Sequence, residues 1–435
     1  MNIKTTSQRL TGSITVPGSK SHTIRAVLLA SMAEGTSKIY NPLPSTDCVS
    51  AANAVSLMGA KVVFDSDMWT VNGAGSNLHL PEDVVNVNNS GSTLYFLTPI
   101  AACFTGWSVF TGDESIRSRP VAHMTDMLEQ LGAHTEMTRP DSNAPPFIVR
   151  GPIQAGVVRT DGQLSQYITG MMMAATRLSG TTYFNLADPK ETPYLKMTKL
   201  WLNRVGVSVQ MSDDFKQISL CGPQQIKAFE ATVPSDWEAV AFPLIAALMS
   251  NSSKISIENI DVSGSQGDDA IVDILQAVGA DIKINTNTKT LFVCGSSPLK
   301  GDSTIKTDGF PDAICALAVI ACFIEGTTTF TDIDICRSKE TDRIRVMAKE
   351  LAKLGADIKD CGDTLVVHGS KKGAALHGGI VESYGDHRVA MALVCAGFGL
   401  PDGESITVKD AECFKVSFPL FIETMNELGA KIKIL

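Results

Sequence analysis

Apolar stretches of helical length alternate with short β-like segments along the whole chain of 435 residues. One phrase recurs: an apolar helical end, then Gly-Ala or Gly-Val, then alternating apolar and polar residues. A glycine in this place is typical of the C′ position of a helix, where a positive φ is needed. The glycines of this phrase, spaced 73 to 76 residues apart, are Gly59, Gly132, Gly206, Gly279, Gly355 and Gly429.

A second phrase interleaves with the first and turns from an apolar run into a β-branched stretch, as at Thr327–Thr331. Its turn residues are Gly35, Gly106, Gly180, Ser252, Gly326 and Gly403. The alternative is that Leu-Gly-Ala is merely a common helix ending, but two independent phrases keep the same period. We therefore predict six repeats, each with a helix, a strand, a second helix and one or two further strands. The period exceeds those of common solenoids, so we group the repeats into two globular domains of three.

The chain length also favours two domains. We predict the crossings between them at two proline-containing segments, near residues 16–18 and 232–235. If the N-terminal strand joins the C-terminal half, one domain comprises residues 1–18 with 236–435 and the other comprises 19–235. Two neighbouring hinge strands suit closure on a ligand, so we expect the active site in the interdomain cleft of this α/β fold.

Composition narrows the class of protein. Hydrophobic residues make up 44% and charged residues 19% of the chain, which is typical of a globular protein. The first residues hold no apolar stretch that could act as a secretory signal. The longest wholly apolar run covers residues 313–324, which is shorter than the roughly 20 residues of a membrane span. We predict a buried helix there and no membrane association.

The cysteines and the net charge exclude further classes. None of the ten cysteines forms a Cys-x-x-Cys pair, which argues against zinc and thioredoxin-type chemistry. Reduced thiols without an export signal indicate a cytoplasmic protein. The net charge of −9 argues against a general nucleic-acid binder. A local cationic pocket is still compatible with it, because placement and not the sum sets the local field.

The first segment with candidate chemistry runs from Gly18 to Arg25. It resembles a phosphate-binding P-loop, but Ser19 separates the glycine from Lys20, so no nucleotide is predicted. A glycine turn that feeds a helix N-terminus with Lys20, Ser21 and Arg25 predicts an anion site. An ordinary capped surface helix is the alternative.

Two further segments lie in the next repeat. Residues 88–93 are small or polar around Gly91 and precede an apolar run, so a ligand could approach the N–H groups of the next helix. Plain N-cap chemistry explains this pattern equally well. Arg117 and Arg119 precede Pro120, and such paired arginines are usually solvated.

The densest cluster of charge covers residues 336–345. If the segment is helical, Lys339 and Arg343 are four residues apart and share a face, with Glu340 beside them as a candidate acid or base. A solvated salt-bridge face is the alternative. Further along, His387 and Arg388 stand at the start of an apolar helix, which is again a geometry for an anion.

The candidate segments all fall where a loop enters a helix, in different repeats. Lys415 adds a lone cation between apolar neighbours. If helix N-termini of both domains point at one cleft, they could hold a phosphate and a carboxylate between them. The seven histidines show no metal-ligand spacing, so no metal is predicted.

With these residues assembled, the sequence resembles the 5-enolpyruvylshikimate-3-phosphate synthase family over essentially its full length. The resemblance implies two domains, each of three βαβαββ units. The motifs that carry it, in order, are Pro-Gly-Ser-Lys20-Ser21 with Arg25, Asn89-Ser-Gly91, Arg119-Pro120, Ser165-Gln166-Tyr167, Pro193-Tyr194, Gln266-Gly-Asp268, Pro311-Asp312-Ala313, Arg337-x-Lys339-Glu340-Thr-Asp-Arg343, Asp386-His387-Arg388 and Lys415-x-x-Phe-Pro.

The resemblance implies transfer of the enolpyruvyl group of phosphoenolpyruvate to the 5-hydroxyl of shikimate-3-phosphate, a step of aromatic amino acid biosynthesis. The reaction passes through a tetrahedral adduct that loses phosphate. It implies no metal and no organic cofactor. It also implies that the enzyme is a target of the herbicide glyphosate, for which Gly91 leaves room. We expect a monomer whose partners are these two small substrates.

The resemblance also implies a role for each matching residue. Asp312 would take the hydroxyl proton, while Glu340 and Lys20 would move protons at C3 and at the adduct. Residues expected to bind phosphoenolpyruvate are Lys20, Gly91, Arg119, Gln166, Arg343, His387, Arg388 and Lys415. Residues expected to bind shikimate-3-phosphate are Ser21, Arg25, Ser165, Gln166, Tyr194, Asp312 and Lys339.

Three positions depart from the family pattern, and all lie within residues 19–235. Tyr95 stands where many members have Arg, Leu164 replaces a second Ser, and Glu191 replaces a phosphate-binding Ser. A carboxylate at 191 would repel a sugar-type phosphate unless it turns away. These departures keep two alternatives open: an enolpyruvyl transferase with another hydroxyl acceptor, and an inactive anion-binding homologue.

Overall fold

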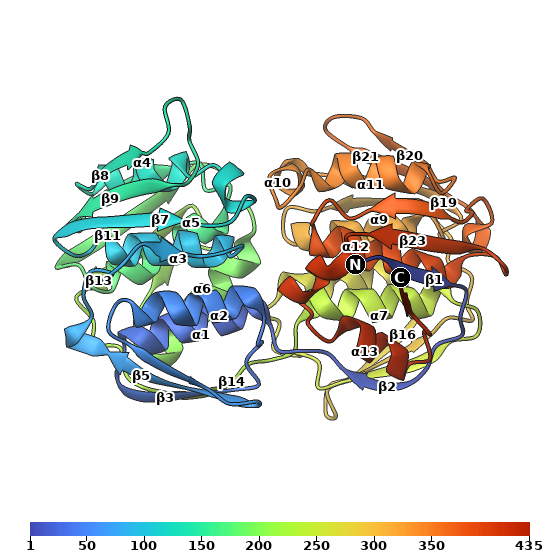
Figure 1. The fold of residues 1–435 in the computed structure, drawn as a ribbon, viewed down its shortest axis with the longest axis horizontal. Coiled ribbons are helices and arrows are strands. Elements are labelled where there is room, and N and C mark those ends of the chain that lie inside the picture. The colour runs from blue at the N-terminus through green and yellow to red at the C-terminus, as the bar shows by residue number, and fades with distance from the viewer. The chain divides into compact units, whose positions relative to one another are not determined.

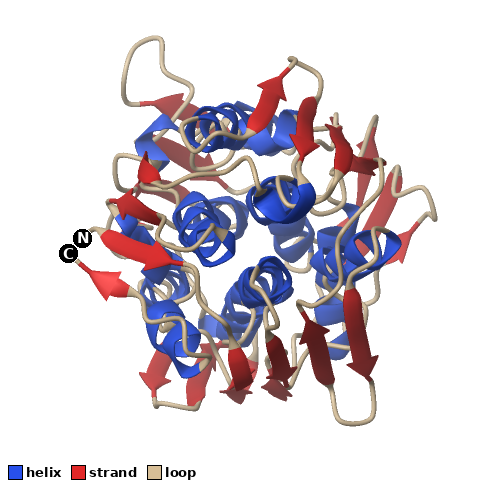
Figure 2. Ribbon diagram, turned by 90° about the vertical axis from the view of Figure 1, so that its right-hand side faces the viewer, coloured by secondary structure: helices blue, strands red, loops and turns tan.

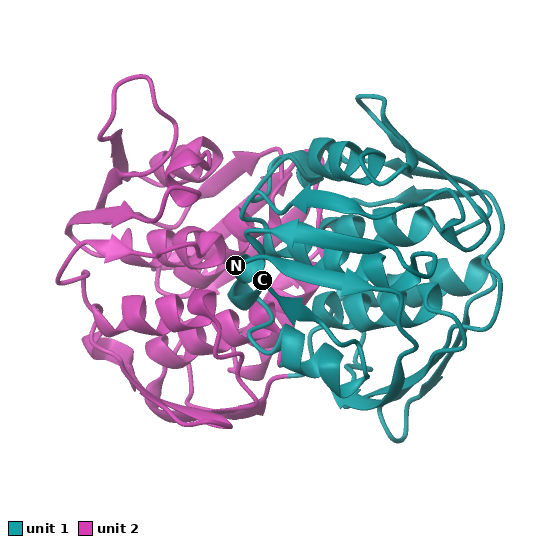
Figure 3. Ribbon diagram, turned by 45° about the vertical axis from the view of Figure 1, so that its right-hand side comes forward, with its two compact units in different colours: residues 1–17, 234–435 teal, residues 18–233 magenta.

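The structure is a computed structural model that describes residues 1–435, and the chain divides into two compact units (Figure 3). Unit 1 comprises Met1–Pro17 and Pro234–Leu435, and unit 2 comprises Gly18–Val233. Each unit has a hydrophobic core of its own, and the two cores share no residue. No helix in the structure is both long and apolar enough to span a membrane.

Unit 2 contains three four-stranded sheets. In each sheet, the strand at one edge is parallel to its neighbour, and the other neighbouring strands are antiparallel. The sheets are β14 (Glu230–Thr232), β3 (Glu34–Tyr40), β5 (Met68–Ala74) and β4 (Lys61–Phe64); then β6 (Val85–Asn86), β7 (Gly106–Thr111), β9 (Phe147–Gly151) and β8 (His134–Met137); then β10 (Val157–Thr160), β11 (Gly180–Leu186), β13 (Gln217–Gly222) and β12 (Gln210–Met211).

Unit 1 repeats the same strand order three more times. Six sheets with one pairing pattern confirm the predicted α/β fold with three repeats in each half. The sheets of unit 1 are β2 (Thr11–Thr15), β15 (Lys254–Glu258), β17 (Thr290–Cys294) and β16 (Asp281–Asn285); then β18 (Ser303–Lys306), β19 (Gly326–Thr331), β21 (Leu365–Gly369) and β20 (Asp357–Asp360); then β22 (Gly379–Glu382), β23 (Ser405–Lys409), β1 (Ile3–Thr6) and β24 (Lys433–Ile434).

Six inner helices are buried almost all round, as expected for helices that are apolar on every face. Figure 2 turns unit 1 toward the viewer and shows strands around the outside with helices gathered within. The apolar run 313–324 contains α9, whose residues are all buried, so the buried helix predicted there is confirmed. The inner helices are α1 (Lys20–Met32), α3 (Gly91–Ala101), α5 (Ser165–Ala175), α7 (Trp237–Met249), α9 (Ile314–Ala321) and α12 (His387–Ala396).

Six outer helices bury one face and leave the other exposed. Each is followed by a glycine of the first phrase, and these glycines have φ between 87° and 101°. Four of them stand at the predicted C′ position, and Gly59 and Gly355 stand one residue later. The outer helices are α2 (Thr46–Ser56), α4 (Ala122–Gln130), α6 (Thr192–Arg204), α8 (Ala270–Ala277), α11 (Arg343–Ala352) and α13 (Phe421–Glu427). Shorter helical turns are α10 (Asp334–Arg337), η1 (Gly75–Asn77), η2 (Ile116–Ser118), η3 (Gly267–Asp269), η4 (Pro311–Ala313), η5 (Lys371–Gly373), η6 (Gly397–Gly399) and η7 (Ala411–Val416).

The two ends of the chain lie together in unit 1 (Figure 1), because β1 pairs with both β23 and β24. The next strand, β2, runs parallel to β15 in another sheet of the same unit. In unit 2 the last strand, β14, also pairs with a strand that is distant in the sequence, since it runs parallel to the first strand, β3. Segments far apart in the sequence therefore complete two sheets in unit 1 and one sheet in unit 2.

Candidate functional site

The beginnings of the inner helices carry most of the predicted site residues. In unit 1, Asp312 lies in η4 immediately before α9, and His387 and Arg388 form the first turn of α12. In unit 2, Lys20 begins α1, Gly91 begins α3 and Ser165 begins α5. Each set is described within its own unit.

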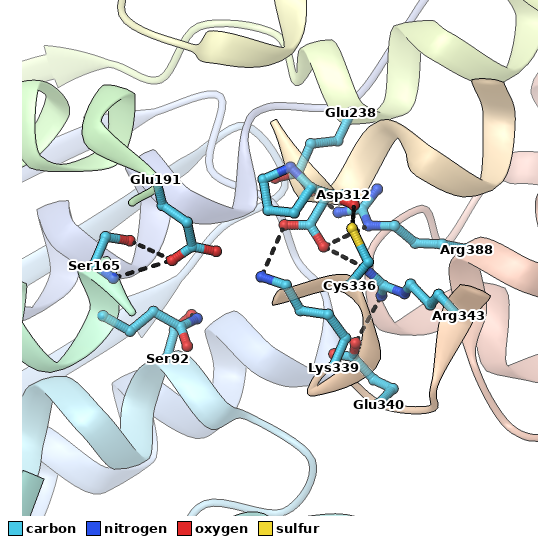
Figure 4. A network of polar contacts seen from close by, with 12 residues as sticks. Ser92, Ser165, Glu191, Glu238, Asp312, Cys336, Lys339, Glu340, Arg343 and Arg388 are labelled. Carbon is cyan, nitrogen blue, oxygen red and sulfur yellow. Dashed lines mark hydrogen bonds and ion pairs between the residues drawn. The ribbon is translucent and has the colours of Figure 1, made fainter. Parts of the chain in front are cut away.

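Arg343 is the centre of an ion-pair network in unit 1 (Figure 4). Its buried guanidinium donates from Nε to Asp386 Oδ2 at 2.9 Å, from Nη2 to Glu340 Oε2 at 2.6 Å, and from Nη1 to Asp312 Oδ1. Burial alone would lower the pKa of this guanidinium, but the three carboxylates raise it well above its ordinary value. Arg343 is therefore a permanent cation in this network.

Asp312 is shared by three basic groups. Besides Arg343, it has Lys339 Nζ at 3.6 Å and Arg388 Nε at 3.5 Å. Burial tends to raise the pKa of Asp312, but Lys339 and Arg343 outweigh burial and lower it to about 2. The side chain is thus an ionised carboxylate at neutral pH, held between three basic groups.

Arg388 also pairs with Glu238, which stands in the first turn of α7. Both side chains are buried. The start of α12 is fixed by Asp386, whose side chain caps the helix by accepting from the N–H of Arg388 at 2.9 Å. The sequence-based reasoning missed Glu238. The sequence feature that could have identified Glu238 is its position at the beginning of an apolar helix, a position that the other candidate residues share.

The segment around Lys339 differs from the prediction. We expected Lys339 and Arg343 on one helical face, but α10 ends at Arg337 and α11 begins only at Arg343. That expectation is wrong because Asp342 caps α11, accepting from the N–H of Arg345 at 3.0 Å. Lys339 and Glu340 therefore lie on the connection, and they reach the network from there and not from a helix.

Two other predicted residues of unit 1, His387 and Lys415, differ in how deeply they are buried. His387 is buried in the first turn of α12, beside the capping residue Asp386. Lys415 is exposed in η7, which packs against α12, and the structure does not bring it into the ion-pair network. Its charge helps to lower the pKa of Glu412, which is lowered mainly by the hydrogen bond from the N-terminal ammonium group.

In unit 2, Lys20 is held by a residue that the sequence-based reasoning missed. Asp47, in the first turn of α2, lies 3.4 Å from Lys20 Nζ through its Oδ2. Asp47 is buried, and the Lys20 side chain is only 12% exposed. An aspartate in the first turn of a helix is so common that it carried no functional signal in the sequence.

Gly91 leaves space for Arg119. A Cβ added to Gly91 would lie 2.6 Å from Arg119 Nη1, so the guanidinium lies directly over this glycine. Arg119 Nη2 donates to Ser115 Oγ at 3.2 Å. Asn89 is fixed in the preceding loop, where its amide donates to Asp113 Oδ2 at 2.7 Å. The absence of a side chain at 91 thus lets a cation approach the start of α3.

The start of α5 is linked to α3 and to the segment that carries Arg119. Gln166 Nε2 donates to Ser92 Oγ at 2.9 Å, and the hydroxyl of Tyr167 donates to the carbonyl oxygen of Pro120 at 3.0 Å. Tyr167 packs edge to face with Tyr95, at 4.7 Å between ring centroids. Tyr95, at which the resemblance led us to expect an arginine, thus forms a buried aromatic pair with Tyr167.

Arg25 is buried between α1, α5 and α6. Its guanidinium donates to the hydroxyl groups of Thr198 and Thr169, at 3.0 and 3.3 Å, and to the carbonyl oxygens of Ser21 and Tyr194, at 3.0 and 3.4 Å. Burial lowers the pKa of Arg25 to about 10, against the opposing effect of Tyr194 and Glu191. Arg25 therefore ties three helices together.

Glu191 turns toward the start of α5. Its carboxylate accepts from the N–H of Ser165 at 3.0 Å and from the Ser165 hydroxyl at 2.8 Å (Figure 4). Its own backbone is left-handed, with a φ of 49° and a ψ of 34°, at the residue before α6. Leu164, the second departure from the family pattern, is the residue before α5 and contributes no side-chain cap.

The network of unit 1 combines Lys339, Arg343 and Arg388 with four carboxylates, so each cation already has an acidic partner. An incoming carboxylate or phosphate can bind there by competing for these cations. No group of three or more His, Cys, Asp and Glu side chains is arranged to hold a metal ion.

Comparisons with known proteins agree over the full length of the chain. The model of the family "EPSP synthase (3-phosphoshikimate 1-carboxyvinyltransferase)" matches residues 4–425. Proteins named 3-phosphoshikimate 1-carboxyvinyltransferase from Ruminiclostridium cellulolyticum and Methanocaldococcus jannaschii are 38% and 37% identical. The first alignment covers 100% of both chains, and the second covers 98% of this chain and 97% of its relative.

Solved structures of EPSP synthase from Acinetobacter baumannii have the same fold. One is 26% identical with a TM-score of 0.83 and covers 99% of each chain. A second is 25% identical with a TM-score of 0.83 and covers 100% of each chain. The chain belongs to the EPSP synthase (3-phosphoshikimate 1-carboxyvinyltransferase) family.

Proposed function

We propose that this chain transfers the carboxyvinyl group of phosphoenolpyruvate to the 5-hydroxyl of 3-phosphoshikimate, in the pathway to chorismate and the aromatic amino acids. The acceptor oxygen forms a bond to C2 while C3 takes up a proton. The adduct then expels phosphate from C2 and loses a proton from C3. The observation that carries this proposal is the ionised Asp312, held between Lys339, Arg343 and Arg388 at the start of α9.

Asp312 is assigned as the acceptor of the hydroxyl proton. With a pKa of about 2, Asp312 is a weak base, because Lys339 and Arg343 stabilise its charge. An anionic substrate that draws these cations toward itself would raise the pKa of Asp312. Substrate binding would then create the base that the reaction needs.

Glu340 and Lys20 are assigned to the proton transfers at C3 and at the adduct. Each is held in place within its own unit, Glu340 by Arg343 at 2.6 Å and Lys20 by Asp47 at 3.4 Å. A carboxylate and an ammonium group provide one acceptor and one donor for these steps.

The remaining predicted residues are assigned to substrate binding, unit by unit. In unit 1, Arg343, His387, Arg388 and Lys415 would bind phosphoenolpyruvate, and Lys339 and Asp312 would bind 3-phosphoshikimate. In unit 2, Lys20, Gly91, Arg119 and Gln166 would bind phosphoenolpyruvate, and Ser21, Arg25, Ser165, Gln166 and Tyr194 would bind 3-phosphoshikimate. A cytoplasmic, monomeric enzyme remains our prediction from the sequence.

The variant Asp312→Asn tests the assignment. It keeps the shape of the side chain but removes the base, so we expect kcat to fall by roughly 10² to 10⁴-fold, while KM for each substrate changes only a few-fold. Formation of the enol ether product, followed by proton NMR, gives the rate. The matched control is Asp360→Asn, a carboxylate of the same unit that pairs with Arg337 outside the network. Parallel losses of turnover and affinity in Asp312→Asn would argue against the role as a base.

A further inference from the structure

Glu191 fills a position that is built to bind an anion. The side chain is buried, with 2% of the residue exposed, and accepts both the first N–H of α5 and the hydroxyl of Ser165, the residue that begins this helix. A free N–H at a helix start, together with a neighbouring hydroxyl, is a common way to bind a phosphate or carboxylate. Here a carboxylate from the chain itself occupies that position.

Glu191 interacts electrostatically with a buried cation, Arg25. Arg25 is buried nearby, and its four hydrogen bonds go to uncharged oxygens. Glu191 acts on Arg25 by Coulomb attraction and opposes the effect of burial on its pKa. The carboxylate thus serves as counterion both to the helix start and to a buried guanidinium. An incoming dianion would place further negative charge beside it.

The backbone keeps Glu191 in this position. Residue 191 is the last one before α6, in a left-handed conformation, and Pro193 follows in the first turn of the helix. Moving the Cα of residue 191 would therefore require the start of α6 to rearrange. The carboxylate can leave Ser165 by rotation of its side chain alone, at the cost of two hydrogen bonds in a buried place.

We propose that Glu191 is a specificity residue for the acceptor: its carboxylate occupies the anion position at Ser165 and must be displaced before a phosphate group of the acceptor can bind there. Glu191 thereby weakens the binding of a phosphorylated acceptor relative to the same acceptor without phosphate. The inference rests on the proposed function, in which Ser165 binds 3-phosphoshikimate.

Two substitutions remove the charge in different ways. Glu191→Gln keeps the shape and an oxygen that can still accept from Ser165, and Glu191→Ser vacates the position. Each should lower KM for 3-phosphoshikimate roughly tenfold or more, because the charge-assisted hydrogen bond to Ser165 becomes a weaker neutral one in Glu191→Gln and is absent in Glu191→Ser. The dissociation constant for shikimate, measured by calorimetry, should change much less. The control Glu230→Gln removes an exposed carboxylate of the same unit, paired with Lys38, and should leave both values unchanged.

The outcomes separate this inference from the proposed function. If the parent chain turns over 3-phosphoshikimate and both Glu191 variants keep its KM or raise it, Glu191 does not compete with phosphate and the inference is wrong. If the parent shows no turnover, the proposed function fails, and calorimetry with 3-phosphoshikimate still decides the inference. Tighter binding by Glu191→Gln than by the parent supports it, and equal or undetectable binding overturns it. Thermal unfolding of each variant verifies that the chain is folded.

Discussion

Asp312, Glu238 and Glu191 are buried or nearly buried acids that the structure places on cations or on a helix start. An ion pair in the interior is stable only when both partners are well hydrogen-bonded, because each has lost its hydration. In these three cases the acid occupies a place that an anionic substrate could take. An anionic substrate that binds there would therefore replace existing interactions and not simply add new ones.

Gly91 provides a test at the residue scale. Its backbone does not have a positive φ, so alanine is compatible with the helix, but the new Cβ would lie 2.6 Å from Arg119 Nη1 and push the guanidinium aside. We expect Gly91→Ala to raise KM for phosphoenolpyruvate roughly tenfold with a smaller change in kcat, and to weaken inhibition by glyphosate at least as much. Steady-state kinetics with both ligands measures this. Gly156→Ala, where the Cβ would meet only Leu131 at 3.2 Å, is the control. Equal KM values in the two variants would contradict the placement of Arg119.

Single residues could be predicted from the sequence only in part. The segment 339–343 combines several charges and is easily recognised in the sequence as a candidate site. The structure places Glu340, Lys339 and Arg343 in one network. Glu238 could not be found in this way, because its partner Arg388 is 150 residues further along the chain and only packing of α7 against α12 brings them together. The same holds for Glu191, whose contact with Ser165 depends on the fold of unit 2.

At the scale of elements, helix starts and their caps place the functional side chains. Asp386 and Asp236 cap α12 and α7 by accepting from the N–H groups of Arg388 and Glu238, at 2.9 and 3.0 Å. A cap fixes where a helix begins, and with it the direction of the side chains in the first turn. The wrong prediction of a helix through Lys339 shows the limit of this reasoning, because it assumed a continuous helix across a segment that a cap at Asp342 divides.

The cap of α12 yields a prediction about stability. Asp386→Ala removes both the cap and a carboxylate from the buried Arg343, so we expect the free energy of unfolding to fall by about 3–5 kcal/mol. Asp386→Asn should lose less, since its amide oxygen can still accept from Arg388. The control Asp342→Ala removes the cap of α11 at a partly exposed side chain and should cost about 1 kcal/mol. Urea unfolding measures all three, and equal losses at 386 and 342 would contradict the central place of Arg343.

At the scale of the whole molecule, the period of the glycine phrases was enough to predict six repeats and an α/β fold. Glycine is favoured at these helix ends because the φ angles are positive, so the helix ends can be recognised from the sequence alone. The sequence led us to place the N-terminal strand in the C-terminal half, but its exact partners were not predictable, because strand pairing joins distant segments. β1 lies between β23 and β24, more than 390 residues along the chain, and nothing local to β1 indicates this.

The separate cores lead to a prediction for fragments. All strands of the sheets of unit 2, and all residues of its hydrophobic core, lie within residues 18–233. The fragment 18–233 should therefore fold alone and unfold cooperatively on heating, as followed by circular dichroism. A fragment that ends at residue 229 lacks β14, which pairs with β3, and should unfold at a lower temperature. Absence of a cooperative transition in the longer fragment would show that unit 2 depends on the rest of the chain.

The most direct test of the proposed reaction is the release of phosphate by the purified chain. With phosphoenolpyruvate and 3-phosphoshikimate together, we predict continuous release, with one phosphate formed for each acceptor consumed. With either substrate alone, no release beyond the background should occur. Release from phosphoenolpyruvate that is independent of 3-phosphoshikimate, or no release when both are present, would contradict the account.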